Sequence, residues 1–190
     1  MNWIRTAIVG VLAAGIATVS DAQSQGKVAP PAQIIVIRHA EKPRDETNPH
    51  LSSAGQSRAL QLVPFITTNG SVSRFGTPAA LFAPRPTRDG KGERSLETLT
   101  PLATALKLDV QTPYRPAEYA VFARWILKNP AYSGKTVVIA WTHDEIPDLA
   151  AELGVKPKPP RWKSKVFDLV YLITYRDGKA ELGQTRYGPR

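Results

Sequence analysis

The sequence predicts an α/β domain of three layers, in which helices cover both faces of a mostly parallel sheet. The apolar, β-branched runs at 34–37 and 136–141 are continuous rather than alternating, which is typical of strands buried on both faces. Segments with helical spacing of apolar residues alternate with the predicted strands along the chain. The last two predicted strands flank Arg176-Asp177-Gly178, a hairpin turn sequence, and therefore form an antiparallel pair.

The first half of the chain predicts strands and helices in alternation. In order, these are a strand, a helix, a strand and a helix, over residues 34–37, 53–66, 79–83 and 95–108. In the second helix, leucines at 96, 99, 102 and 106 recur every three or four positions, so that they share one face. Both helices are therefore expected to pack one face on the sheet.

The second half predicts two more helices and the closing strands. In order, these are a helix, a strand, a helix and two strands, over residues 116–128, 136–141, 146–153, 166–175 and 180–185. Pro116 suits a first helical turn, where the missing N–H costs little, and Gly154 suits a helix end. The loops Arg85–Gly92 and Val155–Ser164 are rich in Pro, Gly and basic residues, and loops of this kind carry substrate contacts when they border a site.

The first 22 residues have the pattern of a removable secretory signal peptide. Arg5 gives a short positive start, Ala7–Val19 is apolar, and Ser20-Asp21-Ala22 offers small residues at both positions that a signal peptidase reads. The apolar run is shorter than a membrane span needs, although an uncleaved anchor is the alternative. We therefore expect a periplasmic or secreted protein without a membrane span after cleavage, with segments 1–22 (signal), 23–33 (flexible lead-in) and 34–190 (domain).

Composition restricts the chemistry of the domain. The 190 residues include no cysteine, which excludes disulfides, thiolate zinc sites and a cysteine nucleophile. The three histidines form no helical metal-binding pair, so we expect neither a metal nor another cofactor. The formal charge of +9 attracts anions, and removal of 1–22 leaves it unchanged. Export, and tryptophans that do not interleave with a basic stripe, argue against nucleic acid as the partner.

Two of the three histidines follow the two most apolar predicted strands. His39 lies two residues beyond the strand 34–37, and His143 lies two residues beyond the strand 136–141 and directly before Asp144. In open α/β sheets, ligands bind beyond the carboxyl ends of the strands. A single histidine at such a place is more often structural, but two at the same sheet edge favour a catalytic site.

Four segments, in order, resemble sequence elements of the histidine phosphatase superfamily, which contains phosphoglycerate mutases and many acid phosphatases. Arg38-His39-Ala40-Glu41 is similar to its Arg-His-Gly/Ala-Glu signature, and 51–59 is similar to its Leu-Ser/Thr-x-x-Gly-x-x-Arg-Ala helix start. Arg94, with Thr98 four residues later, resembles its second arginine element, and 138–143 resembles the strand that delivers a second histidine. The resemblance implies the phosphoglycerate mutase-like form of the predicted fold.

The resemblance also implies hydrolysis of a phosphomonoester through a phosphohistidine. His39 would be the nucleophile, and Arg38 and Arg94 would hold the phosphoryl oxygens, whose geometry a guanidinium matches in a bidentate way. Nearby positive charge would keep His39 neutral, and His143 would complete the phosphate pocket. Arg58 resembles a position that supports or joins this pocket, and a surface arginine is the alternative.

The proton donor to the leaving group is less closely defined. Asp144 follows the second histidine, as in the acid-phosphatase branch of the family, and is our choice. An N-cap of the next helix is the alternative role for Asp144. Glu118 is a candidate by analogy with the other branch, and Glu41 and Glu145 also border the expected site, where Glu41 would lie among the substrate-binding residues.

The sequence departs from the family pattern before Arg94, where Ala83-Pro84 and a basic insertion replace a compact motif. Arg85 or Arg88 could therefore take the place of Arg94, although Thr98 keeps the spacing that favours Arg94. The expected substrate is a phosphorylated small molecule or an envelope sugar phosphate. The alternative is a catalytically weak phosphate- or polyanion-binding protein on the same fold.

Overall fold

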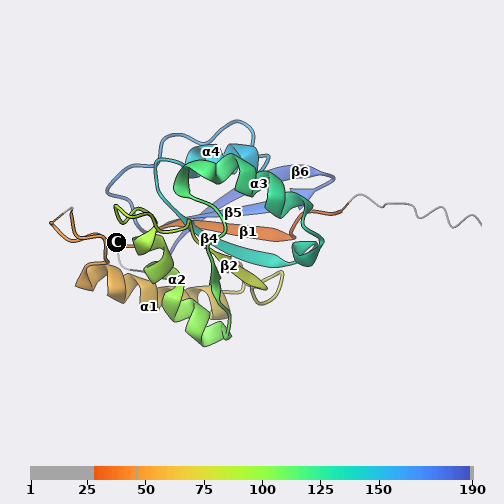
Figure 1. Ribbon diagram of the computed structural model, residues 1–190. Helices are drawn as coiled ribbons and strands as arrows, with labels where there is room; N and C mark the ends of the chain where they lie inside the picture. The colour runs from red at the N-terminus through yellow and green to blue at the C-terminus, as the bar shows by residue number, and fades with distance from the viewer. Residues whose placement is uncertain (1–27, 46, 189–190) are drawn as a thin grey trace, which may run out of the picture.

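A six-stranded mixed sheet forms the centre of the computed structural model, which describes residues 28–45 and 47–188 (Figure 1). Its strand order is β3-β2-β4-β1-β5-β6. The strands are β1 (Gln33–Arg38), β2 (Ala80–Phe82), β3 (Val110–Gln111), β4 (Thr136–Trp141), β5 (Leu169–Arg176) and β6 (Lys179–Arg186). Strands β1 to β4 run parallel to one another, whereas β5 is antiparallel to both β1 and β6. The predicted α/β class and the antiparallel closing pair are therefore confirmed.

Helices cover both faces of the sheet. Helices α1 (Ser53–Thr68) and α2 (Glu93–Leu106) lie on one face, and α3 (Tyr119–Lys128) and α4 (Ile146–Glu152) lie on the other (Figure 1). Along β1, the side chains of Ile35 and Ile37 pack with α1 and α2, whereas Ile34 and Val36 pack with α3 and α4. Every residue of β1 is buried, which explains why its sequence is continuously apolar from Ile34 to Ile37.

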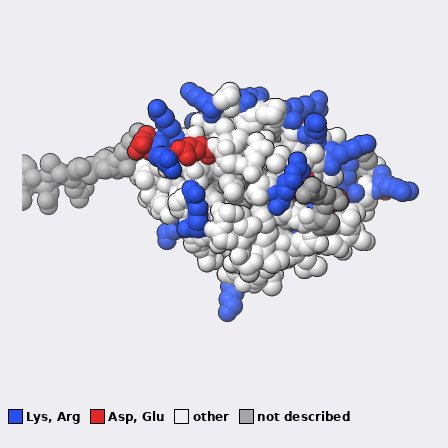
Figure 2. All heavy atoms as spheres, turned by 180° about the vertical axis from the view of Figure 1, so that it is seen from behind, with Lys and Arg blue, Asp and Glu red and all other residues white. Residues whose placement is uncertain are grey.

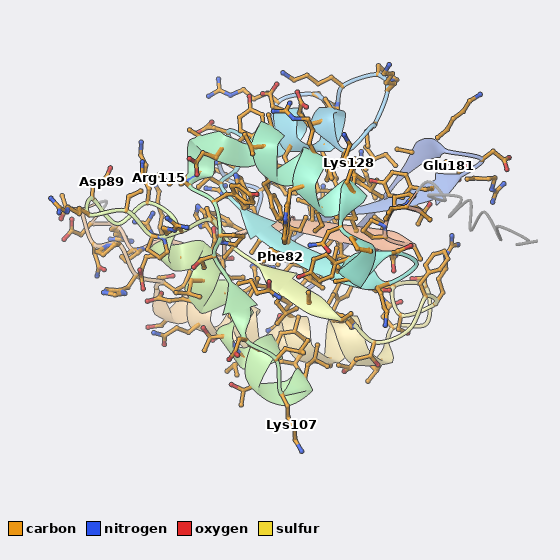
Figure 3. The ribbon with its side chains drawn as sticks, turned by 45° about the vertical axis from the view of Figure 1, so that its right-hand side comes forward. Phe82, Asp89, Lys107, Arg115, Lys128 and Glu181 are labelled. Carbon is orange, nitrogen blue, oxygen red and sulfur yellow. The ribbon has the colours of Figure 1, made fainter. Side chains whose placement is uncertain are left out.

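Aromatic side chains fill the layer between the sheet and α3. Phe82 on β2 contacts Phe122, Trp125 and Tyr132, with ring centroids 5.3 to 5.8 Å apart, and it lies at the centre of the view in Figure 3. The rings of Phe122 and Trp141 stack almost in parallel at 5.2 Å. Each buried aromatic pair adds about 0.5–1.5 kcal/mol beyond its area. The tryptophans named here are therefore used for packing.

Several boundaries differ from the predicted ones. The short edge strand β3 and the 3-10 turns η1 (Pro116–Glu118) and η2 (Pro130–Tyr132) were not expected, and η1 takes the first turn of the helix predicted at 116–128. The β5–β6 turn has positive φ at Asp177 and Gly178, which suits the predicted tight hairpin. A short element such as β3 contains too few residues to show a periodic pattern of apolar residues, so the sequence could not predict it.

The segment that leads into β1 is more ordered than a flexible lead-in over 23–33 implies. The Pro30 carbonyl accepts a hydrogen bond from the Gly134 N–H at 3.1 Å, and the Ala32 N–H donates to the Lys135 carbonyl at 2.8 Å. Gln33 is already the first residue of β1. The predicted signal peptide, 1–22, lies outside the described residues. Within the described part, no helix is both long enough and apolar enough to cross a membrane.

Candidate active site

The carboxyl ends of β1 and β4 meet at one edge of the sheet. The strands are parallel neighbours, and Arg38 on β1 is in register with Trp141 on β4. The backbone N–H of His39 donates to the Trp141 carbonyl at 3.3 Å, so the adjacency continues beyond the last strand residues. This register brings His39 and His143 to the same edge, as the sequence predicted from their positions.

His39 is a buried imidazole, 7% exposed. Its Nδ1 lies 2.7 Å from the carbonyl oxygen of Ala40, which can only accept, so Nδ1 carries the ring proton and Nε2 keeps its lone pair. The pKa of His39 is lowered to about 3, mainly by burial and in smaller part by the charges of Arg38 and Arg94, while the hydrogen bond to Ala40 opposes this shift. The ring is therefore neutral over the physiological range, as a nucleophile must be.

Arg38 is almost completely buried beside His39. Its Nη1 donates to the carbonyls of Ser164 and Val166, and its guanidinium carbon lies 3.9 Å from the centroid of the Phe167 ring. The buried Nε has no hydrogen-bond partner among the described residues. Burial lowers the pKa of Arg38 to about 10, so the group stays charged at neutral pH. A buried cation with an unused donor is suited to bind an anion.

Arg94 lies on the first turn of α2, and its charge lowers the pKa of both Arg38 and His39. Its Nε donates to the His50 carbonyl at 3.2 Å, and its Nη2 donates to the Asn48 carbonyl at 2.6 Å. Both contacts tie the arginine to the loop that precedes α1. The structure therefore brings Arg94 near enough to Arg38 and His39 for its charge to act on both.

Glu97 fixes the same loop one helical turn further along α2. Its carboxylate accepts the backbone N–H of Leu51 at 2.7 Å and lies 2.5 Å from Nδ1 of His50. His50, Glu97 and Glu93 each contribute one atom of a type that binds metal ions, and these atoms lie within 4.8 Å of one another. The positions of the histidines in the sequence did not predict this cluster. The hydrogen bonds of Glu97 show a structural use for this cluster.

Thr98 connects α2 directly to the nucleophile segment. Its Oγ1 accepts the backbone N–H of Ala40 at 2.9 Å and donates to the Arg94 carbonyl at 2.6 Å, and the side chain is fully buried. One hydroxyl therefore joins the residue after His39 to the residue that bears the second guanidinium. This explains why a threonine stands four positions after Arg94.

His143 and Asp144 follow β4 on the other side of the site. Nε2 of His143 lies 3.5 Å from Oδ1 of Asp144, which lies 3.7 Å from Nη2 of Arg161. Burial is the main cause that lowers the pKa of His143, and the charge of Arg38 adds to it, while Asp144 opposes. The helix α4 begins at Ile146, after Glu145 in the N-cap position, so Asp144 is not its N-cap.

Arg58 and Glu41 form an ion pair, with Nε 2.7 Å from Oε1. Arg58 also donates to the carbonyl of Tyr187 at 3.0 Å and is 8% exposed, so it is not a surface arginine. The charge of Glu41 raises the pKa of Arg38, which places the pair close to the site. These contacts connect α1 to the C-terminal segment and to the chain that follows β1. In the structure, Glu41 is the ion-pair partner of Arg58, and no contact shows it as a substrate ligand.

The other acidic candidates are engaged elsewhere. Glu118 accepts the backbone N–H of Arg115 at 2.7 Å, and Glu145 accepts a hydrogen bond from the hydroxyl of Thr142. Among the basic alternatives, Arg85 donates to the carbonyls of Thr112 and Pro113, at 3.3 and 2.6 Å. Arg88 is exposed, in the loop that contains Asp89, which Figure 3 shows at one end of the molecule.

Sequence reasoning missed two residues of this site. Phe167, the ring against Arg38, lies 6.1 Å from the His39 ring, centroid to centroid, and no local pattern marks it. Arg161 belongs to the basic loop Val155–Ser164, which the sequence singled out without assigning any of its residues. Only the fold shows that this loop passes the carboxyl ends of β1 and β4.

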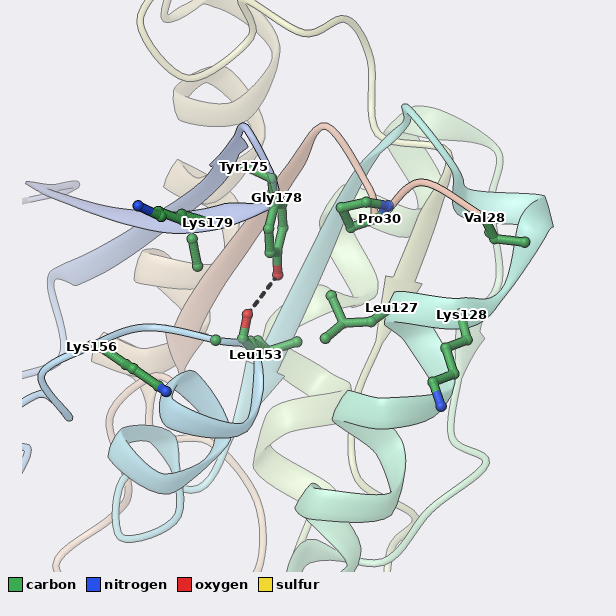
Figure 4. A pocket seen from close by; sticks show the side chains of 11 residues that line it. Val28, Pro30, Leu127, Lys128, Leu153, Lys156, Tyr175, Gly178 and Lys179 are labelled. Atoms are coloured by element: carbon green, nitrogen blue, oxygen red, sulfur yellow. Dashed lines mark hydrogen bonds between the residues drawn. The ribbon is translucent and has the colours of Figure 1, made fainter. Parts of the chain in front are cut away.

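A cavity lies away from this edge of the sheet. A cavity of about 950 Å³ adjoins the beginning of β1 and the β5–β6 turn, and its lining includes Leu127, Leu153, Tyr175 and Lys128 (Figure 4). The Tyr175 hydroxyl donates to the Leu153 carbonyl at 3.0 Å across it. Because it lies at the opposite end of the strands from His39, this cavity is not the candidate active site.

Comparison with known proteins identifies the fold. No protein-family model matches the sequence, and no curated protein matches it in sequence. Solved structures of mycobacterial glucosyl-3-phosphoglycerate phosphatase are similar. The complex with inorganic phosphate has a TM-score of 0.54 at 12% identity, covering 80% of this chain and 95% of that one.

Two further structures of the same mycobacterial enzyme agree. The native form has a TM-score of 0.53 at 10% identity, covering 82% of this chain and 98% of that one. The complex with VO3 has a TM-score of 0.54 at 11% identity, with 80% and 97% covered. The chain therefore has the same α/β fold as this enzyme, the phosphoglycerate mutase-like fold that the sequence predicted.

Proposed function

We propose that this protein is an exported phosphomonoesterase that works through a phosphohistidine on His39. The observation that carries the proposal is the state of His39: a buried, neutral imidazole whose Nδ1–H is held by Ala40. The charges of two arginines, Arg38 and Arg94, act on this ring. A neutral nitrogen nucleophile beside paired guanidinium groups is the arrangement that phosphoryl transfer requires.

The geometry supports a two-step reaction. Nε2 of His39 attacks phosphorus, the bond to the leaving oxygen breaks, and that oxygen takes a proton from Asp144. Water then attacks phosphorus and gives a proton to Asp144, while the phosphorus–nitrogen bond breaks and phosphate leaves. Arg38 and Arg94 stabilise the charge on the phosphoryl oxygens in both steps. His143 adds a further contact to the phosphoryl group.

Asp144 is the proton donor that the contacts favour. Its side chain is 60% exposed beside His143, whereas Glu41 is paired with Arg58. Glu118 and Glu145 are hydrogen-bonded within their own turns. Asp144 therefore combines access to a leaving group with closeness to His143, and its charge also acts on Arg38. The proposed substrate is a sugar phosphate or another phosphorylated small molecule, in line with the name of the mycobacterial enzyme.

Hydrolysis of phenyl phosphate with trapping of the phosphoenzyme tests this function. Wild-type protein quenched during turnover of ³²P-labelled substrate should carry acid-labile, base-stable label. His39→Ala should carry none and should lose at least about a thousandfold in kcat. Circular dichroism checks that the variant is folded. Equal rates in the two proteins would refute the mechanism, and saturable phosphate binding without any turnover would favour a phosphate-binding protein instead.

Export has its own test, because the predicted signal peptide lies outside the described residues. Expression of the full chain in a Gram-negative host, followed by fractionation, should yield a periplasmic or secreted product. Intact-mass spectrometry should place its N-terminus at Gln23. A product that retains Met1 would contradict cleavage without touching the proposed chemistry.

A further inference from the structure

We propose that the cavity beside the beginning of β1 is a second ligand site, and that it binds an amphiphile with an aliphatic chain and a carboxylate head group. The cavity lies at the opposite end of the strands from His39. Among the described residues, none that lines it belongs to the candidate active site. Binding there does not require the proposed phosphatase function.

The cavity has apolar walls and a volume that suits a small molecule. Its volume of about 950 Å³ falls in the range of small-molecule sites, about 300–1,000 Å³. Figure 4 shows Leu127, Leu153 and Tyr175 at the centre of the lining. Leu153 is fully buried and belongs to the core between the sheet, α3 and α4, against which Leu127 and Tyr175 pack. Walls of this kind bind a hydrocarbon chain by removing its surface from water.

The polar side-chain groups of the wall are already paired. The Tyr175 hydroxyl donates to the Leu153 carbonyl at 3.0 Å, the dashed line in Figure 4. Among the described residues, no buried side-chain atom that lacks a hydrogen-bond partner belongs to the lining. A sugar or another polar ligand would lose its hydrogen bonds to water without gaining partners from these side chains. The wall therefore favours an aliphatic chain.

The charged residues of the lining are all lysines. They are Lys128 at the end of α3, Lys156 after α4 and Lys179 at the start of β6, and all three are exposed. In the described part of the chain, none of the three forms an ion pair. Their methylene stems add apolar surface, while the ammonium groups stay in water. Three cations around an apolar cavity complement an anionic head group.

Most of the nearby negative charge is compensated by arginines. Figure 2 shows Asp and Glu atoms beside Lys and Arg atoms at the end of the molecule where the N-terminal trace enters. Glu152, which precedes the lining residue Leu153, lies 3.5 Å from Arg124. Glu181, labelled in Figure 3, lies 3.6 Å from Arg176. The local balance at the cavity therefore remains positive.

The sequence before Val28 favours an occupant from outside the chain. Val28 and Pro30 belong to the lining, so the chain enters β1 beside the cavity. Once residues 1–22 are removed, as proposed above, the residues before Val28 are Gln-Ser-Gln-Gly-Lys, at 23–27. These residues are polar or lack a side chain, and they offer no large apolar group to cover walls of leucine and tyrosine.

Calorimetric titration of the exported protein with decanoate, octanoate and 1-decanol tests both parts of the site. Each buried methylene increases the affinity about fourfold, so decanoate should bind at least about tenfold more tightly than octanoate. Decanoate should also bind about fivefold more tightly than 1-decanol, which is the upper size of an exposed ion pair. In NMR spectra, decanoate should shift the amide resonances of Leu127, Gly154 and Tyr175. Shifts confined to the residues around His39 would overturn the inference.

Two triple variants separate the lysines of the cavity from the net charge of the protein. Replacement of the three lining lysines by glutamine should bring the affinities for decanoate and 1-decanol within about twofold of each other. The matched control replaces three exposed lysines outside the lining, Lys91, Lys107 and Lys163, and should keep the fivefold preference. A preference that survives in the first variant, or disappears in both, would overturn the inference.

Filling the cavity tests the apolar part. Ala180 is half-buried on β6 and lines the cavity, and an aromatic side chain suits a strand, so Ala180→Trp should fold, which circular dichroism checks. This variant should lose at least about tenfold in affinity for decanoate. Unchanged binding would overturn the inference. So would the absence of saturable decanoate binding to the wild type, which is the result expected if another part of the chain fills the cavity.

Discussion

At the residue scale, burial of one imidazole couples catalysis to stability. The pKa of His39 is about 3 in the folded protein and about 6.5 in an unfolded chain, so the unfolded state binds more protons between these values. Stability from this group is fully present above about pH 6.5 and is lost as the pH falls. Between pH 6.5 and 5, His39 should reduce the free energy of unfolding by about 1.6 kcal/mol.

Urea denaturation at these two pH values measures the loss, and His39→Asn is the matched control because it cannot titrate. The variant should show a smaller decrease between pH 6.5 and 5 than the wild type. Identical decreases would mean that His39 is not held neutral. In the same pH range, the Cε1 resonance of His39 should not titrate in NMR spectra.

At the element scale, the site depends on one contact between α2 and the end of β1. Thr98→Val keeps the side-chain shape but removes both hydrogen bonds of the hydroxyl, which leaves the Ala40 N–H buried and unpaired. Such a loss costs about 1–3 kcal/mol of stability. Because Ala40 also holds Nδ1 of His39, we expect kcat/KM for phenyl phosphate to fall about tenfold.

Thr100→Val is the control on the same helix. Thr100 is exposed, and its hydroxyl donates only along the helix, to the Leu96 carbonyl at 3.0 Å. This variant should change the unfolding free energy by less than about 0.5 kcal/mol and leave activity unchanged. If Thr98→Val and Thr100→Val behave alike in chemical denaturation and in kinetics, the contact does not position the nucleophile.

A close approach also explains an element-scale feature of the sequence. A Cβ at Gly55, in the first turn of α1, would lie 2.4 Å from the Glu41 carbonyl oxygen. The helix can therefore approach the chain after His39 only because this position is glycine. The glycine of the helix-start motif thus has a steric role, which the spacing of the motif did not reveal.

At the scale of the whole molecule, the sequence predicts what local patterns can encode. The continuous apolar runs of β1 and β4 predict their burial, and the residues that follow them predict the sheet edge that carries His39 and His143. The contact of Phe167 with Arg38 could not be predicted, since it joins segments 129 residues apart without a periodic pattern. Likewise, the local sequence around Arg58 is compatible both with an exposed arginine and with one that is paired with Glu41. Only the packed fold shows that the ion pair forms.

The way in which Arg38 is anchored affects how such a protein can change over evolutionary time. Arg38 donates to the main-chain carbonyl oxygens of residues 164 and 166, at the end of the loop that contains Arg161, and not to their side chains. Exposed side chains on that loop, Lys163 and Lys165 among them, can therefore be exchanged without releasing the guanidinium. New ligand preferences can then arise by substitution alone, whereas insertions or deletions in the loop would disturb the reacting centre.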